Sequence, residues 1–275
     1  MIYTAAILAR GLGTRMRRDD ATAQVNSSQA AAADTGVKGM IPIAGAGSTS
    51  RPFLDYVISG LADAGITDVV LVLGPEHEGV RSYYRTDAPP TRVTIRFAEQ
   101  ALPIGTANAV LAAADVIGDE SFLVLNADNY YPVEAFRALA AENSAGTIAF
   151  DRDALVRDGN IDAERVRSFA VLDVTPANFL AGIIEKPGDS LDLASPSARW
   201  VGMNVWAITR SLVSACRRVP KSVRGEYELP EAVGLAIREG VMIRAIPMHA
   251  PVLDLSRRAD IAAVVSRLKH LEPRP

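Results

Sequence analysis

Strand-like apolar stretches alternate with helix-like stretches through the first half of the chain. The predicted strands are residues 3–9, 68–73, 93–97 and 122–126. The predicted helices, which have apolar side chains at helical spacing, are residues 53–64, 77–84, 106–116 and 133–143. Strands that alternate with helices in this way are typical of β-α-β units. The pattern therefore predicts an α/β fold with a mixed, mostly parallel sheet that has helices on both faces.

The second half of the chain is less regular. Its predicted strands are residues 147–151, 169–174, 180–185, 200–208 and 241–247. Its predicted helices are residues 211–218, 229–239 and 260–271. The chain has neither an internal repeat nor a Pro- or Ser-rich linker. We therefore expect a single domain over residues 1–275, whose second half caps the sheet.

Charge and cysteine content exclude several functions. The 275 residues include 29 Lys and Arg against 32 Asp and Glu, a net charge of −3, so nothing favours nucleic-acid binding. The single cysteine, Cys216, cannot form an internal disulfide, and we expect it to be a packed helix residue. The sequence contains no apolar run long enough to span a membrane, and its first residues do not resemble a signal peptide. The expected location is the cytoplasm, with no membrane partner.

A Gly-rich turn follows the first predicted strand. Residues 8–16 read Leu-Ala-Arg-Gly-Leu-Gly-Thr-Arg-Met, so the turn contains Gly11 and Gly13. Glycine lets the backbone approach phosphate oxygens closely, and Arg15 adds a guanidinium beside them. The turn lacks the Gly-Lys-Ser/Thr of a Walker loop and the third glycine of a dinucleotide fingerprint. Alone it is a weak signal, because ordinary turns also contain two glycines.

A polar insertion, residues 18–37, separates this turn from the next motif. Loops of this length are uncommon inside compact domains unless they act as lids or are disordered. Two interpretations remain open: a passive surface insertion, or a partly helical lid over a ligand. The phosphate-binding signals on both sides favour the lid.

Six further motifs follow in order. They are Lys-Gly-Met-Ile-Pro at 38–42, Gln-Ala-Leu-Pro-Ile-Gly-Thr at 100–106, Leu-Asn-Ala-Asp-Asn at 125–129, Glu-Lys-Pro at 185–187, Arg-Gly-Glu-Tyr-Glu at 224–228 and Leu-Asp-Leu at 253–255. With the Gly-rich turn, this series resembles the sugar-1-phosphate nucleotidyltransferases, or nucleotide-diphospho-sugar pyrophosphorylases. It is similar to glucose-1-phosphate thymidylyl- and uridylyltransferases. Each motif alone is weak, but their order is specific and covers nearly the whole chain.

The resemblance implies a Rossmann-like nucleotide-diphospho-sugar transferase fold, with a nucleotide-binding half (1–145) and a sugar-phosphate-binding half (146–275). It implies that a nucleoside triphosphate and a sugar 1-phosphate react, with Mg²⁺ as cofactor, to give a nucleotide sugar and pyrophosphate. Members of the family are commonly dimers or tetramers, so a homo-oligomer is compatible with it.

The resemblance also assigns roles. The nucleotide-binding residues would be Leu8, Ala9, Gly11, Gly13, Thr14, Arg15, Gln100, Gly105 and Thr106. Arg15 would stabilise the leaving pyrophosphate, and Lys38 would neutralise charge around the α-phosphate. Asp128 and Asp254 would hold Mg²⁺, which prefers oxygen ligands. With Arg15 and Lys38, Asp128 forms the predicted catalytic set.

The predicted sugar-phosphate site consists of Glu185, Lys186, Asn204 and Glu226. Lys186 would bind the phosphate, while the carboxylates would accept hydrogen bonds from sugar hydroxyls. Structural roles remain open for several of these residues: helix caps for Asp128 and Asp254, solvated lysines for Lys38 and Lys186, and a first-turn acid for Glu226. The alignment of Asn204 is uncertain by one residue.

The nucleobase is indicated by Gln100, since a glutamine amide matches the imide edge of uracil or thymine. UTP or dTTP is therefore favoured, although guanylyl- and cytidylyltransferases share the scaffold. Arg10 stands where relatives carry a small residue, and it either points away or contacts the nucleotide. Two alternatives remain: a catalytically silent regulatory homologue that binds nucleotide sugars, and a guanylyl- or cytidylyltransferase for a cyclitol or non-sugar phosphate.

Overall fold

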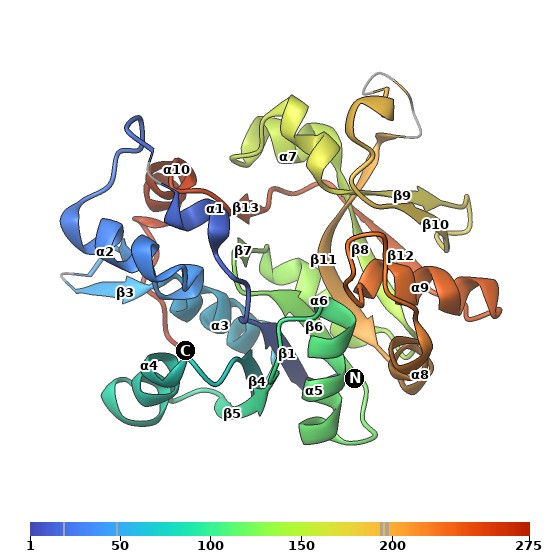
Figure 1. The fold of residues 1–275 in the computed structure, drawn as a ribbon, viewed down its shortest axis with the longest axis horizontal. Helices are drawn as coiled ribbons and strands as arrows, with labels where there is room; N and C mark the ends of the chain where they lie inside the picture. Colours follow the sequence, from blue (N-terminus) through green and yellow to red (C-terminus); the bar gives the residue numbers. More distant parts are fainter. Residues whose placement is uncertain (19, 48, 193–194, 196–197) are drawn as a thin grey trace.

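A computed structural model describes residues 1–18, 20–47, 49–192, 195 and 198–275, and a nine-stranded sheet runs through this part of the chain (Figure 1). Four strands of the first half are parallel and lie in the order β6-β1-β4-β5. They are β1 (Thr4–Leu8), β4 (Asp68–Leu73), β5 (Thr94–Glu99) and β6 (Phe122–Asn126). The predicted parallel sheet is thus confirmed.

The second half extends this sheet. Strand β11 (Trp200–Ile208) pairs antiparallel with β6, β8 (Gly146–Asp151) and β9 (Ala170–Val174). Strand β10 (Leu180–Ile184) pairs with β9, and β12 (Arg244–Met248) is parallel to β8. The expectation that this half caps the sheet is therefore only partly right, because five of its strands belong to the sheet itself.

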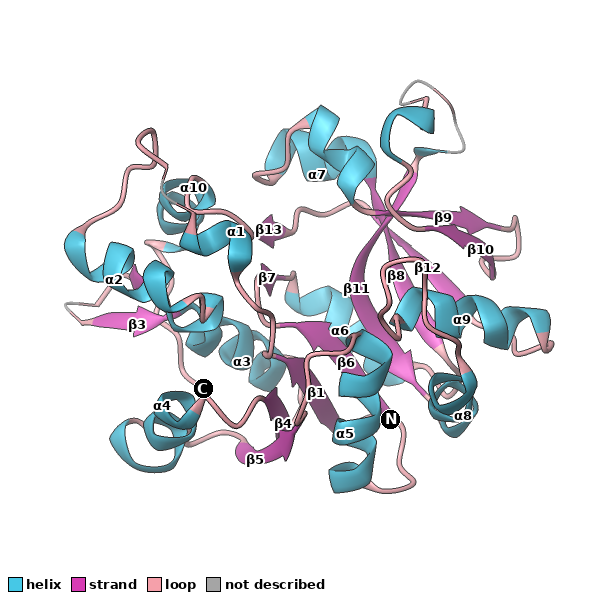
Figure 2. Ribbon diagram, in the orientation of Figure 1, coloured by secondary structure: helices cyan, strands magenta, loops and turns pink. Residues whose placement is uncertain are grey.

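Alternate side chains of the central strands face two separate cores. Ile7 and Leu71 belong to one buried cluster with α3 (Phe53–Asp63), α6 (Val133–Ala141) and α10 (Asp260–Leu268). Ala6 and Val70 belong to the other, with α5 (Thr106–Ile117), α8 (Arg210–Arg218) and α9 (Leu229–Arg238). Successive residues of a strand point to opposite faces, so continuous apolar strands require helices on both sides (Figure 2).

Differences from the predicted elements are small. Helix α4 (Glu78–Ser82) continues into a π-helical segment, Tyr83–Asp87, where both Tyr83 and Tyr84 donate hydrogen bonds to the buried Asp55. Strand β12 starts three residues later than predicted. The sequence did not predict several short elements. These are α1 (Thr14–Arg17), β2 (Pro42–Ala44), β3 (Ser50–Pro52), β7 (Asn129–Tyr130), α7 (Arg152–Asp158), β13 (Leu253–Asp254) and the 3₁₀ turns Lys38–Met40, Ala163–Ser168 and Gly188–Ser190.

The insertion contains one helix, α2 (Ser27–Thr35), as the partly helical interpretation expects. Asn26 and Gln29 form a reciprocal capping box at its start. Arg258, which is buried, donates to Asp34 near its end and to the carbonyl of Met16 in α1. The insertion is thus anchored to the C-terminal part of the chain. Asp19 lies outside the described residues, and the role of a lid stays a prediction.

Candidate active site

Two adjoining cavities lie at the carboxyl ends of the central parallel strands. The first, of about 320 Å³, begins where β1 and β6 end side by side, with Leu8 in register with Asn126. Open α/β sheets bind ligands at this edge. Its lining includes eight predicted site residues of the first half of the chain, namely Leu8, Ala9, Gly11, Lys38, Gln100, Gly105, Thr106 and Asp128.

The second cavity, of about 230 Å³, lies between the two halves of the chain. Its lining includes the predicted residues Arg15, Asp128, Glu185, Lys186, Asn204, Glu226 and Asp254. The two cavities share four lining residues: Thr106, Asn126, Asp128 and Glu226. Ligands in the two cavities would therefore meet at Asp128.

The Gly-rich turn differs from its predicted role in part. Gly13 has a left-handed φ of 62° and packs against Gly36, so that a Cβ at position 13 would overlap the Gly36 backbone. Gly13 and Thr14 line neither cavity, and Arg15 lines the second rather than the first. Gly13 therefore shapes the turn by its contact with the end of α2.

Gln100 is buried, and two hydrogen bonds from its Nε2 fix the orientation of its side-chain amide. Its Nε2 donates to the carbonyl of Gly105 at 2.9 Å and to Oδ1 of Asn108 at 3.0 Å. Both amide protons are thus engaged, while Oε1 has no hydrogen-bond partner among the residues that the structure describes. Gly105 has a φ of 124° and packs against the backbone of Tyr227, so it joins this segment to residues 224–228.

Arg10 is held at the wall of the first cavity. Its guanidinium donates to Glu76, with an Nε–Oε1 distance of 3.2 Å, and to the backbone carbonyl of Gln100. The side chain is only 8 % exposed. Arg10 thus does not point away from the cavity. Its guanidinium is held between two loops of the protein, next to the residue predicted to bind the base.

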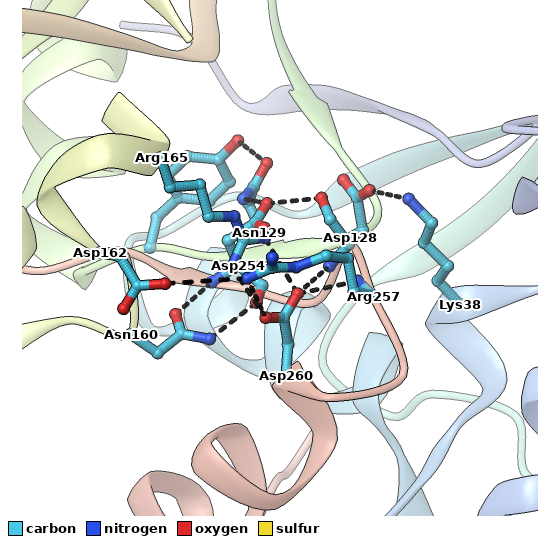
Figure 3. Close-up of polar contacts among 11 residues, drawn as sticks. Lys38, Asp128, Asn129, Asn160, Asp162, Arg165, Asp254, Arg257 and Asp260 are labelled. Atoms are coloured by element: carbon cyan, nitrogen blue, oxygen red, sulfur yellow. Dashed lines mark hydrogen bonds and ion pairs between the residues drawn. The ribbon is translucent and has the colours of Figure 1, made fainter. Parts of the chain in front are cut away.

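Lys38 and Asp128 form an ion pair at the junction of the cavities. Lys38 Nζ lies 2.6 Å from Asp128 Oδ2, and both side chains are at most one-fifth exposed (Figure 3). The two residues are 90 positions apart in the sequence. The fold thus brings together two members of the predicted catalytic set, a cation and a carboxylate.

Asp254 is deeply buried next to this pair. Its Oδ1 accepts hydrogen bonds from Asn129 and Ser256, both at 3.0 Å, and its Oδ2 is bonded to Arg165. Burial, followed by the negative charge of Asp128, raises the pKa of Asp254 to about 6. Asp128 and Asp254 both line the second cavity.

Sequence reasoning missed the partners of Asp254. Arg165 belongs to the 3₁₀ turn Ala163–Ser168 and bridges Asp254 and Asp260, at the start of α10 (Figure 3). No motif includes Arg165, and its carboxylate partners are about ninety residues away. Asn129 could have been found, since it follows Asp128 directly in the 125–129 motif.

The far wall of the second cavity contains two residues with left-handed backbone. Lys186 has a φ of 47° and Asn204 a φ of 54°, and neither is a glycine. Lys186 Nζ lies 3.5 Å from Glu185, whose pKa is raised by burial. Strained backbone of this kind is common at functional sites.

The 224–228 motif contributes a fixed ion pair to the same cavity. Arg224 Nη2 lies 2.7 Å from Glu228 Oε2, and Ser222 also donates to Glu228. The hydrogen bonds from Arg224 and Ser222 keep the pKa of Glu228 below its usual value. Glu226 has no such partner among the described residues, is exposed and lines both cavities.

Two kinds of feature are absent from the described residues. No helix in this part of the chain is long and apolar enough to cross a membrane. No three His, Cys, Asp or Glu side chains gather there into a metal-binding group.

The fold, with two cavities that share Asp128 at the carboxyl ends of its parallel strands, is typical of a nucleotide-binding α/β transferase. Residues 35–241 match the family model described as nucleotidyl transferase, so the chain belongs to this family.

Its relatives agree with this assignment. The chain is 28 % identical to the UTP–glucose-1-phosphate uridylyltransferase AglF of Haloferax volcanii, over 96 % of each chain. It is also 28 % identical to a glucose-1-phosphate thymidylyltransferase of Streptomyces antibioticus, over 98 % of this chain and 67 % of that protein. Among solved structures, UTP-bound UGPase from Acinetobacter baumannii matches 99 % of this chain and 96 % of its own with a TM-score of 0.74, at 18 % identity. That structure supports the fold.

Proposed function

We propose that this chain transfers a nucleoside monophosphate from UTP or dTTP to a sugar 1-phosphate and releases pyrophosphate. The observation that carries the proposal is the pair of cavities that share Asp128, beside the Lys38 ammonium. The triphosphate would occupy the first cavity and the sugar phosphate the second. The relatives described above act on substrates of these two kinds.

In this reaction a phosphate oxygen of the sugar phosphate attacks the α-phosphorus. The bond from that phosphorus to the bridging oxygen breaks, and pyrophosphate leaves with the electron pair. Such transfers depend on positioning and on charge neutralisation. Lys38 in the first cavity would neutralise the α-phosphate, and Lys186 in the second would stabilise the incoming sugar phosphate. Arg15 lines the second cavity, so its predicted role toward the leaving pyrophosphate requires the triphosphate to extend past Asp128.

The residues present fit a magnesium ion. Asp128 and Asp254 offer oxygen ligands to one cavity. Burial, followed by the charge of Asp128, raises the pKa of Asp254, and a cation at this place would favour its ionised form. When bound there, Mg²⁺ would supply positive charge to the reacting phosphates. Asn129, Ser256 and Arg165 would hold the Asp254 carboxylate in its orientation.

In the structure the Gln100 amide offers a nucleobase one acceptor, rather than the donor and acceptor that would match the imide edge of uracil or thymine. With both Nε2 protons engaged, Oε1 can only accept a hydrogen bond. The ring N3–H of uracil and thymine can donate it, but so can the exocyclic amines of cytosine and adenine and the ring N–H of guanine. The preference for UTP or dTTP is therefore supported by the relatives, which are named as a uridylyltransferase and a thymidylyltransferase.

Pyrophosphate release with Mg²⁺ tests the proposal, with ATP, CTP, GTP, UTP and dTTP against a panel of sugar 1-phosphates. We expect turnover with UTP or dTTP and a hexose 1-phosphate. Asp128→Asn should reduce this turnover by about a thousandfold or more, because it removes a charge from the reacting centre. Turnover with CTP alone would contradict the base assignment. Nucleotide binding without any turnover would favour the regulatory alternative.

A further inference from the structure

A buried arginine lies on one of the two carboxylates of the proposed metal site. The Arg165 side chain is 8 % exposed. Its Nη2 donates to Oδ2 of Asp254 and, at 2.9 Å, to Oδ2 of Asp260, while Nη1 lies 2.7 Å from Oδ1 of Asp260 (Figure 3). The guanidinium thus spans the two carboxylates as a fixed bridge.

Each of the three carboxylates at this site already has a protein cation beside it. Asp128 is paired with Lys38, Asp254 with Arg165, and Asp260 with both Arg165 and Arg257. Arg257 also lies 4.0 Å from the exposed Asp162. The second oxygen of Asp254 accepts from Asn129 and Ser256, so both of its oxygens have protein partners.

We propose that Arg165 is an internal counter-cation of the metal site, which lowers the affinity of the nucleotide-free protein for a divalent cation. The metal would then enter together with the triphosphate. This inference rests on the proposed function, since it takes Asp128 and Asp254 as the metal ligands. Arg165 is a positioning residue here, because it acts through Asp254.

The physical reason is the cost of unbalanced charge in a buried cluster. A divalent cation alone would add two positive charges beside carboxylates that protein cations already neutralise, in a site that is largely out of water. In a metal–triphosphate complex the phosphates bring the negative charge that offsets the ion. The same arrangement therefore disfavours the free ion and accepts the complex.

Titration of the nucleotide-free protein with Mn²⁺, followed by electron paramagnetic resonance, measures this effect directly. We expect Arg165→Gln to bind Mn²⁺ more tightly than the wild type, by about tenfold or more, because a positive charge close to the ion is removed. Damage to the site would weaken metal binding, so a gain of affinity separates the electrostatic role from a structural one.

Arg257→Gln is the matched control. Arg257 also contacts Asp260 but is 45 % exposed, and no contact joins it to Asp254 in the described part of the chain. The same chemical change at this position should alter the Mn²⁺ affinity by no more than about twofold, because water screens the charge. An equal gain in both variants would show a general charge effect and overturn the role of Arg165.

A second variant guards against misfolding, since Arg165→Gln leaves two carboxylates buried together. The double variant R165Q/D260N removes one charge of each sign and still releases Asp254 from its ion pair, so it should also gain affinity, although less than Arg165→Gln alone. Adding Asp254→Asn should abolish it. If neither variant gains affinity while Asp254→Asn alone weakens Mn²⁺ binding, the counter-cation role is wrong and the metal site remains. If Asp254→Asn has no effect in any background, the proposed metal site is wrong as well.

Discussion

At the scale of single residues, Lys186 and Asn204 show how the second cavity obtains its polar groups. Both adopt a left-handed backbone conformation, with φ of 47° and 54°, at positions that line the cavity. For a residue other than glycine this conformation costs about 1–3 kcal/mol, so it persists only where the surrounding structure fixes it. We infer that the fold accepts this strain to aim the two side chains.

Substitution of Lys186 separates its backbone from its ammonium group. Lys186→Gly and Lys186→Ala both remove the charge, and each should raise the KM for sugar phosphate about tenfold or more, with the nucleotide KM changed by no more than about twofold. The glycine variant should also be the more stable of the two to denaturant, because glycine adopts a positive φ without strain. Equal effects on both substrates would contradict the proposed role of Lys186.

The largely buried imidazole of His77 should make the stability of the protein depend on pH. Its Nδ1 accepts a hydrogen bond from the Gly74 N–H at 3.1 Å, and burial lowers its pKa below the usual 6.5. The imidazole of His77 therefore takes up a proton more readily in the unfolded chain than in the folded protein. The contribution of neutral His77 to the free energy of unfolding is complete above pH 6.5 and is lost as the pH falls through the lowered pKa.

Denaturant unfolding between pH 7.5 and 5 measures this contribution. His77→Asn should reduce the fall in the free energy of unfolding at acid pH. His270→Asn, at an exposed position, is the matched control and should leave the pH profile unchanged. Identical profiles for the wild type and His77→Asn would show that His77 does not contribute.

At the scale of elements, the turn before α1 and the end of α2 form one unit. Gly13 and Gly36 both have left-handed backbone and lie against each other, and Arg17 of α1 donates to the carbonyl of Thr35 at 2.7 Å. This contact sets the position of α1 and therefore of Arg15. The insertion thus supports the phosphate-binding turn even before any role as a lid is considered.

Two alanine substitutions in the same turn test this contact. Gly13→Ala should lower the free energy of unfolding by about 1–3 kcal/mol, because its Cβ would overlap the Gly36 backbone at an unfavourable φ. Gly11→Ala is the control: a Cβ there meets nothing within 4 Å, so the stability should change by less than about 0.5 kcal/mol. Chemical denaturation gives both values, and equal stabilities would show that the contact is unimportant.

The longer elements could be predicted from the sequence because each has a clear local pattern. Strand β4 is a continuous apolar run, and strand β11 was predicted with the bounds that it has. Strands β7 and β13 have two residues each and pair across more than 120 positions, so no local pattern indicates them. The π-helical turn depends on hydrogen bonds to Asp55, about thirty residues away.

The site residues also divide into those that a sequence motif indicates and those that depend on contacts between distant parts of the chain. Asp128, Lys38 and Lys186 belong to sequence motifs, and they line the cavities as expected. Gly13 belongs to a motif too, but its contact with Gly36 depends on how α2 packs, which the sequence alone did not indicate. Arg165 belongs to no motif, and its importance follows only from a contact with Asp254 that spans 89 positions.

At the scale of the whole molecule, one sheet joins the two halves of the chain. Strand β6 from the first half pairs with β1 on one side and with β11 from the second half on the other. We therefore expect a single cooperative unfolding transition, which calorimetry would detect as equal calorimetric and van't Hoff enthalpies. Two resolved transitions would indicate separate domains.

A fragment of residues 1–145 should aggregate, because it exposes the apolar edge of β6.

The shared wall of the two cavities also has a consequence for inhibition. A compound that joins a nucleoside to a sugar mimic through a non-cleavable linker could fill both cavities across Asp128. Once one end is bound, the other is held at a high effective concentration beside its own cavity. Such a compound should bind far more tightly than either half alone, and it would distinguish this protein from enzymes whose two cavities are arranged differently.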